Sequence, residues 1–519
     1  MDTTHTDVLI LGTGVPEAVL SAAAARAGKS VVHVDANDFY GGPWASLTLE
    51  ELARDADKIR FPRSGHVPRD TLPEELAPLN RHYALSLRPA LLPATGAMIE
   101  ALVRSNVASY ATFRLLEHVC IYDGALSRVP SSKSEIFKQR EISLADKRRL
   151  MRFIERVAPA PDGTPAAPEA PDGSIESVLS ETGVEQHLRK ALLYGVCLAW
   201  NGNEPARTAL ARTAAVLAGY GRYGNSSLLV GQYGGTGELA QGFCRSAAVH
   251  GATFVLGHPV ASLAHDGSRW TLALDGVNHR FTADKLVGSA EAVRDALGIT
   301  VSTDAAAYEH VSILVLDKAL ELDAEREPES ALLVLPPETA GTENAVMVLM
   351  QGEGTFSCPK GQYVYHLVTH ARKKESVLGN AASLVCTLVG TEPLVEFHTT
   401  RALEDGVPEL PHCTIIRDGT PLRSQSTLWP TDAPLQQVPN CTEALDHAVY
   451  NAEQAFWATF GTERQHSDAI SAAAARRTAR SPTEYEGRGG IDPSLEDVVS
   501  THAELEFFAP RESSNDDAM

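Results

Sequence analysis

The sequence predicts an α/β fold related to dinucleotide-binding (Rossmann) domains, enlarged by antiparallel strands and interrupted by an all-helical insertion. An apolar strand, a glycine turn and an Ala-rich helix follow one another between residues 7 and 35, which is typical of a β-α-β unit. Helical patterns and a Pro-rich stretch occupy 144–220. Short alternating strands separated by turn residues follow after residue 253.

The first unit contains a glycine turn that is altered at one position. Gly12 and Gly14 match the first two glycines of Gly-x-Gly-x-x-Gly, the turn that holds a dinucleotide pyrophosphate. Glu17 replaces the third glycine, and its carboxylate suits the helix dipole but repels a pyrophosphate. Asp35 stands near the position of the ribose-binding acid, although acids also end strands for other reasons. The turn predicts the fold and argues against the cofactor.

The order of patterns predicts the domain organisation. We expect a discontinuous α/β domain of residues 1–112 and 226–460, with a helical domain of 113–225 inserted in it. Residues 157–174 are Pro-rich, which predicts an exposed insertion between helices. Residues 461–519 are rich in small and charged residues, so we expect a mostly disordered tail.

Composition argues against several classes of function. The formal net charge of −21 makes nucleic acid and anionic membranes poor partners, whereas a protein with basic segments is suitable. An acidic surface that only keeps the protein soluble is the alternative. The seven cysteines include no Cys-x-x-Cys pair, which argues against a disulfide framework or a zinc site. The sequence predicts neither a membrane-spanning segment nor a signal peptide, so we expect a cytosolic protein.

Six ordered blocks between residues 12 and 245 carry a family resemblance. The blocks are Gly-Thr-Gly-Val-Pro-Glu at 12–17, Val-Asp-Ala-Asn-Asp-Phe-Tyr-Gly-Gly-Pro-Trp-Ala-Ser-Leu at 34–47, Arg-His-Tyr-Ala-Leu-Ser-Leu-Arg-Pro-Ala-Leu at 81–91, Val-Pro-Ser-Ser-Lys-Ser-Glu-Ile-Phe at 129–137, Arg-Tyr-Gly-Asn-Ser at 222–226, and the segment 233–245 with Gly-Glu-Leu-Ala-Gln-Gly-Phe-Cys-Arg at its end. Together they resemble the family of Rab escort proteins and Rab GDP-dissociation inhibitors.

This resemblance implies an FAD-binding-like domain without a flavin or other cofactor, together with a helical second domain. It also implies binding of GDP-bound Rab GTPases, shielding of their geranylgeranyl lipids, presentation to the α/β heterodimer of the Rab geranylgeranyltransferase, and transient membrane contact. Trp-Ala-Ser at 44–46, Arg-His-Tyr at 81–83 and Phe-Cys-Arg at 243–245 resemble escort proteins more than dissociation inhibitors. A dissociation inhibitor remains the alternative.

The resemblance places a Rab-binding platform on six residues, which are Tyr40, Arg81, Arg222, Glu238, Gln241 and Arg245. Glu238 and Arg245 are seven positions apart, so a helix projects them from one face. A helix cap at Glu238 and an ordinary surface ion pair at Arg245 are the alternatives. The turn before Glu238 has one residue more than is usual in the family, which affects the geometry of Tyr233.

The resemblance implies three further surfaces. Val107, Tyr110 and Phe113 would form an apolar helix stripe that holds the Rab C-terminus, with core packing as the alternative. A basic run would dock the transferase, or would be an ordinary solvated helix face; it consists of Lys147, Arg148, Arg149 and Arg152. Apolar residues of the helical domain would line a prenyl groove or fill a core, among them Leu150, Phe153, Leu192, Val196 and Leu217.

The resemblance implies a non-catalytic binding protein, for which this chain needs neither a catalytic nucleophile nor a metal site. The competing class is a flavin-dependent oxidoreductase, which the β-α-β unit and Asp35 favour and which Glu17 opposes.

Overall fold

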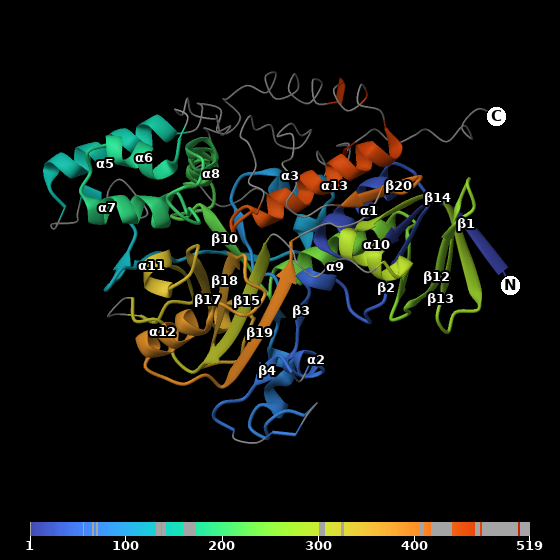
Figure 1. Cartoon of the computed structure of the whole chain (residues 1–519), viewed down its shortest axis with the longest axis horizontal. Coiled ribbons are helices and arrows are strands. Elements are labelled where there is room, and N and C mark those ends of the chain that lie inside the picture. Colours follow the sequence, from blue (N-terminus) through green and yellow to red (C-terminus); the bar gives the residue numbers. More distant parts are fainter. Residues whose placement is uncertain are drawn as a thin grey trace.

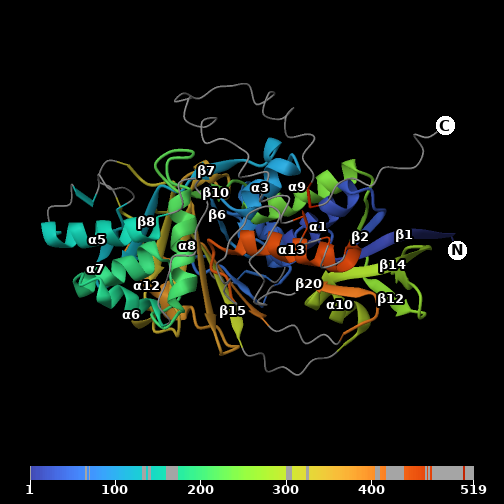
Figure 2. The ribbon, with the colours of Figure 1, turned by 90° about the horizontal axis from the view of Figure 1, so that it is seen from above.

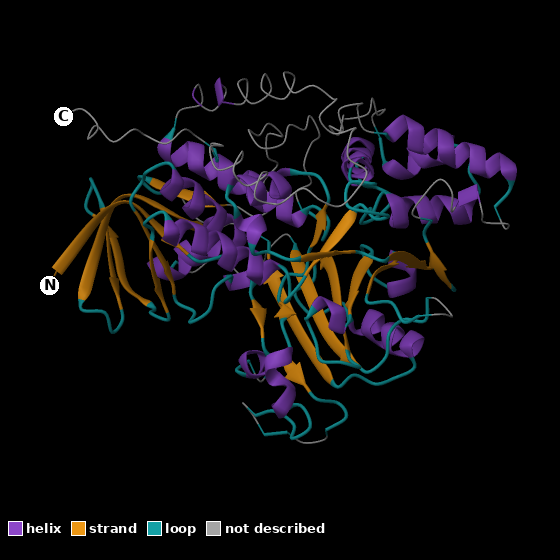
Figure 3. Ribbon diagram, turned by 180° about the vertical axis from the view of Figure 1, so that it is seen from behind, coloured by secondary structure: helices purple, strands orange, loops and turns teal. Residues whose placement is uncertain are grey.

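The computed structural model describes residues 2–55, 57–64, 67–68, 71–130, 136–137, 142–158, 173–299, 307–322, 326–403, 409–416 and 438–461, together with 465, 468–469 and 507–508. Two large sheets form the α/β part (Figure 1), and Figure 3 shows their strands as two separate groups with helices above them. The predicted α/β fold is confirmed.

The first sheet contains the β-α-β unit. β1 (Asp2–Leu11) pairs in parallel with β2 (Val31–Asp35) and β14 (His279–Ser289). In the parallel pair of β1 and β14, Val8 to Leu11 lie opposite Lys285 to Gly288. The remaining strands are β11 (Thr253–Leu256) beside β2, β13 (Trp270–Leu274) and β12 (Val260–His265) beyond β14, and β20 (Cys413–Ile416), which also pairs with β14.

Helices cover both faces of this sheet because successive β1 side chains point to opposite sides. Val8 and Ile10 pack in the cluster that contains α1 (Val15–Arg26), whereas Leu9 and Leu11 pack with Val293 of α10 (Ala290–Leu297). The Ala-rich α1 is buried between α9 (Thr236–Val249) and α13 (Ala444–Phe460), and α3 (Ala97–Arg104) packs on α13 (Figure 2).

The second sheet is mostly antiparallel. Its strands run in the order β4 (Ile59–Arg60), β19 (Val395–Ala402), β15 (Tyr308–Leu316), β18 (Tyr363–Ala371), β17 (Val346–Gln351), β16 (Ser330–Leu335), β8 (His118–Tyr122) and β9 (Leu126–Arg128). Two smaller sheets join β6 (Leu91–Pro93), β10 (Leu228–Gly231) and β7 (Phe113–Leu115), and β3 (Ser46–Leu47) with β5 (Leu85–Ser86). The short helices α2 (Leu49–Ala53) and α11 (Pro337–Ala340) and the longer α12 (Gly379–Val389) lie around these sheets.

A helical unit lies at one end of the molecule (Figure 1). It consists of α5 (Leu144–Val157), α6 (Ile175–Glu181), α7 (Gln186–Lys190), the π-helix η4 (Ala191–Val196) and α8 (Ala206–Ala218). The predicted start of an all-helical segment at residue 113 is wrong, because residues 113–128 form β7, β8 and β9. These strands pair with β10, β16 and each other. The two-domain division itself stays a prediction.

The predictions of an exposed insertion at 157–174 and a disordered tail at 461–519 concern residues that lie largely outside the described ones. Within the tail, Phe507 and Phe508 are described and are buried. Among the described helices, none is long and apolar enough to cross a membrane.

Candidate functional site

The turn after β1 has left-handed backbone at Gly12 (φ +87°), as a dinucleotide-binding turn does. The carboxylate of Asp35, the candidate ribose-binding acid, is however hydrogen-bonded to groups of the protein itself. Oδ2 of Asp35 accepts hydrogen bonds from the backbone N–H and the hydroxyl of Thr13, at 2.8 and 2.6 Å. Oδ1 accepts from the backbone and side-chain nitrogens of Asn37, both at 2.9 Å. Asp35 therefore fixes the turn to β2, and its carboxylate is engaged by protein donors.

Glu17 occupies the anion side of the same turn. It is 3% exposed, and a Cβ added to Gly14 would lie 2.5 Å from its Oε2 and 3.3 Å from Cδ1 of Trp44. The ring of Trp44 is in turn covered by the Arg88 guanidinium at 4.2 Å. A dinucleotide does not fit these residues, since a carboxylate and an indole lie where the pyrophosphate must approach the backbone.

The α9 helix presents the exposed side chains of Glu238, Gln241 and Arg245. Its opposite side packs closely on glycine, because a Cβ on Gly237 would lie 2.5 Å from the Ser46 backbone nitrogen. A Cβ on Gly242 would lie 2.8 Å from the Val107 side chain. This close packing fixes the orientation of α9, and the shared face that the spacing predicts is present.

The α9 face combines an acid with a cation that rests on an aromatic ring. Partial burial raises the pKa of the Glu238 carboxyl above its usual value. The Arg245 guanidinium lies 5.0 Å from the centre of the Tyr110 ring, a cation–π distance. A partner that covered this face would meet a fixed positive group and an exposed carboxylate.

Two other predicted platform residues lie on segments attached to the start of α9. Tyr40 is partly buried, with its ring edge-on to Phe254 of β11 at 6.0 Å. Arg81 is exposed on the 3₁₀ helix Ala77–His82, which leads into β5. In β5, the Ser86 hydroxyl is hydrogen-bonded to that of Thr236 at 2.7 Å.

Arg222 lies elsewhere, in the loop between α8 and β10. It is exposed, and its guanidinium lies 5.5 Å from the ring of Tyr223. Two neighbouring residues of this loop, Tyr220 and Asn225, line the cavity described below. The structure therefore associates Arg222 with the helical unit rather than with the α9 face.

The turn before α9 exposes an aromatic pair. Tyr233, Gly234 and Gly235 all have left-handed backbone, with φ of +54°, +79° and +73°. The Tyr233 ring stacks on Phe356 at 5.0 Å, and the two residues are 48% and 51% exposed. Phe356 also has left-handed backbone, at φ +54°. Phe356 was missed in the sequence, where its loop carries no periodic pattern.

The predicted helix stripe of Val107, Tyr110 and Phe113 is wrong as a structure. Left-handed Asn106 (φ +62°) separates α3 from the 3₁₀ turn Val107–Ser109, and Phe113 begins β7. Val107 is fully buried against α9, and Phe113 is partly buried in the same core cluster. Tyr110 is the most exposed of the three, at 37%.

The basic run of α5 is divided between two sides of the helix. Arg148, Arg149 and Arg152 are exposed. Lys147 is buried, and its Nζ donates to the Phe137 carbonyl at 2.9 Å. The prediction that all four share one face is therefore wrong for Lys147.

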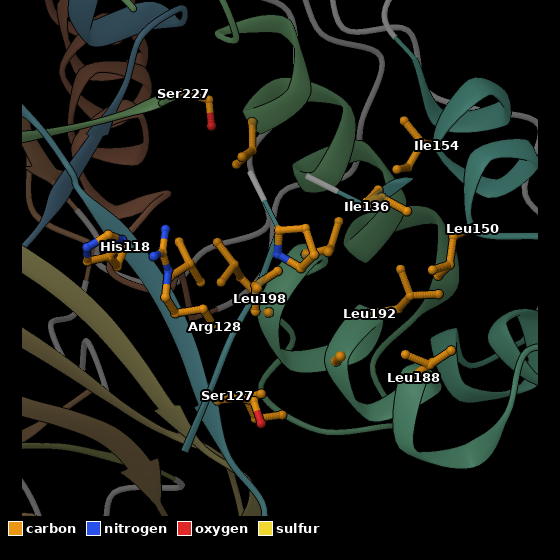
Figure 4. Close-up of a pocket in the computed structure, with 18 of the residues that line it drawn as sticks. His118, Ser127, Arg128, Ile136, Leu150, Ile154, Leu188, Leu192, Leu198 and Ser227 are labelled. Carbon is orange, nitrogen blue, oxygen red and sulfur yellow. The ribbon is translucent and has the colours of Figure 1, made fainter. Parts of the chain in front are cut away.

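An apolar cavity of about 930 Å³ lies between the helical unit and strands β8 and β9 (Figure 4). Leu150 of α5, Leu192 and Val196 of η4 and Leu217 of α8 line it. These are four of the five residues that the sequence assigned to a groove or a core. The fifth, Phe153, is buried in the adjoining apolar cluster.

Unusual backbone forms the wall of this cavity. The lining passes through the π-helix η4 and Leu198, which has left-handed φ of +48°. Gly195 is required for a close approach, because a Cβ there would lie 2.3 Å from Cγ2 of Val129. Strained backbone of this kind persists only where the surroundings impose it, and it gathers at functional sites.

A buried ionic cluster holds this wall in place. One guanidinium nitrogen of Arg212 donates to the carbonyls of Cys197 and Leu198, both at 2.8 Å. Nδ2 of Asn440 donates to the Leu198 carbonyl as well, at 2.8 Å. Arg212 also pairs with Glu204 and, at 3.0 Å, with Glu443. The wall is thus tied to the segment that precedes α13.

Comparison with known proteins identifies the family. A family model described as "GDI: GDP dissociation inhibitor" matches residues 1–388. The chain belongs to this family. The resemblance that the sequence motifs predict is confirmed.

The similar curated members of the family include proteins named as transferase components. The chain is 27% identical over 397 residues to the "Rab proteins geranylgeranyltransferase component A" of Drosophila melanogaster, covering 71% of this chain and 75% of the relative. It is 29% identical over 372 residues to the protein of that name from Saccharomyces cerevisiae, covering 70% of this chain and 61% of the relative. The Rab GDI of Plasmodium falciparum has the same fold, with a TM-score of 0.65 at 18% identity, covering 88% of this chain and 98% of that one.

Proposed function

We propose that this member of the GDP dissociation inhibitor family is a Rab escort protein. It binds GDP-bound Rab GTPases, presents them to the catalytic α/β heterodimer of the Rab geranylgeranyltransferase, and shields the attached lipids until membrane delivery. The observation that carries the lipid step is the cavity of about 930 Å³ in the helical unit, in a chain whose similar relatives include geranylgeranyltransferase components A.

The size and lining of the cavity suit an isoprenoid. Ligand cavities of roughly 300–1,000 Å³ with apolar walls are the usual sites for molecules of this size. A twenty-carbon prenyl chain left in water costs more than roughly 10 kcal/mol at about 0.8 kcal/mol per CH₂, so a prenylated GTPase needs a carrier. We place the prenyl group between η4 and strands β8 and β9.

The α9 face supports the binding of the GTPase. Glu238, Gln241 and Arg245 project together, and the exposed Tyr233–Phe356 pair lies at the turn from which α9 begins. Aromatic residues and Arg contribute most to protein interfaces. We propose that this face and Tyr40 contact the switch surface, with Arg81 at its edge. Arg222 would instead meet the GTPase near the cavity.

The chain's own role is proposed to be non-catalytic. Among the described residues, no group of three His, Cys, Asp or Glu is placed to hold a metal ion. The exposed Arg148, Arg149 and Arg152 of α5 are proposed to face the transferase. A cytosolic location with transient membrane contact follows from the carrier role.

A reconstituted prenylation reaction tests the proposal. A Rab, the catalytic heterodimer and geranylgeranyl pyrophosphate should give prenylated Rab only when this chain is added. A reaction that proceeds equally without the chain, or does not start with it, would contradict the escort function.

A dissociation inhibitor is the second candidate, because a Schizosaccharomyces pombe protein named "Probable secretory pathway GDP dissociation inhibitor 1" is 28% identical over 296 residues. Such a protein would extract prenylated Rab from membranes without supporting the transferase reaction. Failure of prenylation together with successful extraction would therefore select it.

A further inference from the structure

Two phenylalanines from the far end of the chain are buried against the α/β part. Phe507 and Phe508 are each 3% exposed, and their rings stack on one another at 4.7 Å. Phe507 also stacks on Phe243 of α9 at 6.5 Å, and Phe508 lies 5.5 Å from Phe456 of α13. A row of four rings thus bridges α9 and α13. We call the site formed by Phe243, Phe456 and Arg104 the aromatic groove.

The aromatic groove also recognises main chain. Nη1 of Arg104, in the last turn of α3, donates to the carbonyl oxygen of Phe507 at 3.4 Å. Its Nε lies 3.7 Å from a carboxylate oxygen of Glu100. Two apolar rings and one carbonyl are features that an extended segment with adjacent apolar residues can offer. The groove is therefore suited to a short peptide rather than to a folded surface.

The aromatic groove adjoins the candidate GTPase surface. Arg104 ends α3 just before Val107, and the Ser246 hydroxyl of α9 donates to the Ser105 carbonyl at 3.3 Å. Phe243 follows Gly242, whose Cβ position would be 2.8 Å from Val107 and 3.4 Å from the Tyr110 ring. Tyr110 in turn supports Arg245. The groove and the Tyr110–Arg245 surface are thus two sides of one corner.

We propose that Phe507 and Phe508 plug the aromatic groove, and that the apolar C-terminal segment of a bound GTPase displaces them. The exchange rests on the proposed function, whereas the plug does not. Two side chains are a small interface, and the long connection after Gly461 adds an entropic cost of closure, so the plug is exchangeable. A GTPase held on α9 supplies its own C-terminal segment at high local concentration. The tail therefore covers the apolar groove until the GTPase binds.

Peptide binding tests the plug on the full-length chain. A fluorescent peptide of residues 500–513 should bind the Phe507→Ser/Phe508→Ser variant at least tenfold more tightly than the wild-type chain, whose own tail competes. The same peptide with both phenylalanines changed to serine should bind neither protein. Val249→Ser, which alters an exposed apolar residue at the end of α9, should behave as wild type. Equal peptide affinity for the double variant and the wild type, or binding of the serine peptide, would overturn the plug.

Hydrogen exchange on the unmodified chain tests the displacement without any variant. The amides of the buried Phe507 and Phe508 should be protected in the free protein and should exchange at least tenfold faster after saturation with GDP-bound Rab. Saturation with Rab that lacks its C-terminal segment should leave them protected. Unchanged protection at full Rab occupancy would overturn the displacement. If Rab does not bind at all, the proposed function fails, and the peptide experiment still decides whether the plug exists.

Discussion

The turn after β1 is filled by side chains of the protein, whereas the helical unit encloses an open cavity. In the turn, Glu17, Trp44 and the hydrogen-bonded Asp35 fill the region where a dinucleotide would approach. At the cavity, the π-helix η4 and left-handed Leu198 form part of a wall around about 930 Å³. Side chains of the protein fill the turn after β1, whereas unusual backbone helps to form the cavity of the helical unit.

The comparison shows that fold and binding capacity are separate properties. The residues at the turn decide whether such a fold can hold a dinucleotide, and here they do not fit one. Function must therefore be argued from the sites.

The largest expected effect is at the cavity. Val196→Trp places a large side chain into the lining, so affinity for a geranylgeranylated peptide should fall at least 100-fold, about 2.7 kcal/mol. Fluorescence titration measures this loss, and circular dichroism checks the fold. Val196→Leu is the matched control and should retain binding. Undiminished lipid affinity in a folded Trp variant would show that the lipid binds elsewhere.

On the α9 face, Arg245→Ala should weaken binding of GDP-bound Rab by roughly 1.5–3 kcal/mol, because a cation supported by Tyr110 is lost. The thermal midpoint should change little, since the side chain is exposed. Arg207→Ala, which removes an exposed guanidinium from α8, is the charge-matched control. Tyr40→Ala should be measured beside it. Loss at Tyr40 alone would mean that a platform exists but that Arg245 is not part of it.

The wall of the cavity can be tested through its closest contact. Gly195→Ala should destabilise the chain by roughly 1–3 kcal/mol, because the new Cβ would lie 2.3 Å from Val129. Val129→Ala removes the opposing methyl groups. In that background Gly195→Ala should therefore cost little, so the double variant should be nearly as stable as Val129→Ala alone. Chemical denaturation gives the four free energies. Additive effects of the two changes would contradict the proposed contact.

The α/β part buries the carboxyl group of Asp446, whose contribution to the stability of the fold depends on pH. Burial raises the pKa of Asp446 to about 7, although a carboxylate oxygen accepts from the Met98 amide at 2.7 Å. The folded chain therefore binds this proton more tightly than the unfolded chain, and the associated stability is lost as pH rises from about 4 through 7. Asp446→Asn should become more stable relative to wild type between pH 5 and pH 8, by about 1 kcal/mol or more. A difference between the two that is independent of pH would refute the shift.

The smallest expected effect is at the turn. Glu17→Gly restores the third glycine of the motif, yet the purified variant should remain colourless and bind no flavin adenine dinucleotide. Trp44 and the bonds of Asp35 would still fill the site. Visible absorbance measures the outcome. Stoichiometric flavin in this variant would mean that Glu17 alone excluded the cofactor.

Sequence patterns predicted the helices and strands whose residues repeat with a regular period. The β-α-β unit expected between residues 7 and 35 corresponds to β1, α1 and β2, and the strands expected after residue 253 correspond to β11–β18. The shared face of Glu238 and Arg245 followed from helical periodicity, whose spacing is fixed. The start of the helical unit was missed because β7–β9 are short, and their partners lie far away in the sequence.

Features that depend on tertiary contact could not be predicted. Lys147 and Arg148 are neighbours in the same charge run, but packing turns only Lys147 inward to the Phe137 carbonyl. The Tyr233–Phe356 pair joins two loops over 120 residues apart through left-handed backbone that neither residue type favours. Whether Leu192 lines a cavity or fills a core depends on a π-helix, for which the sequence carries no pattern.

Photoaffinity labelling tests the central claim most directly, which is that the helical unit holds the lipid and the β1 turn holds no ligand. A geranylgeranyl analogue with a photoreactive end group, attached to a Rab C-terminal peptide, would be cross-linked to the full-length chain, and the labelled peptides mapped by mass spectrometry. The account predicts labels in α5, η4 and α8, with excess unlabelled geranylgeranyl peptide suppressing them. Labels concentrated between Gly12 and Trp44, with these three helices unlabelled, would contradict it.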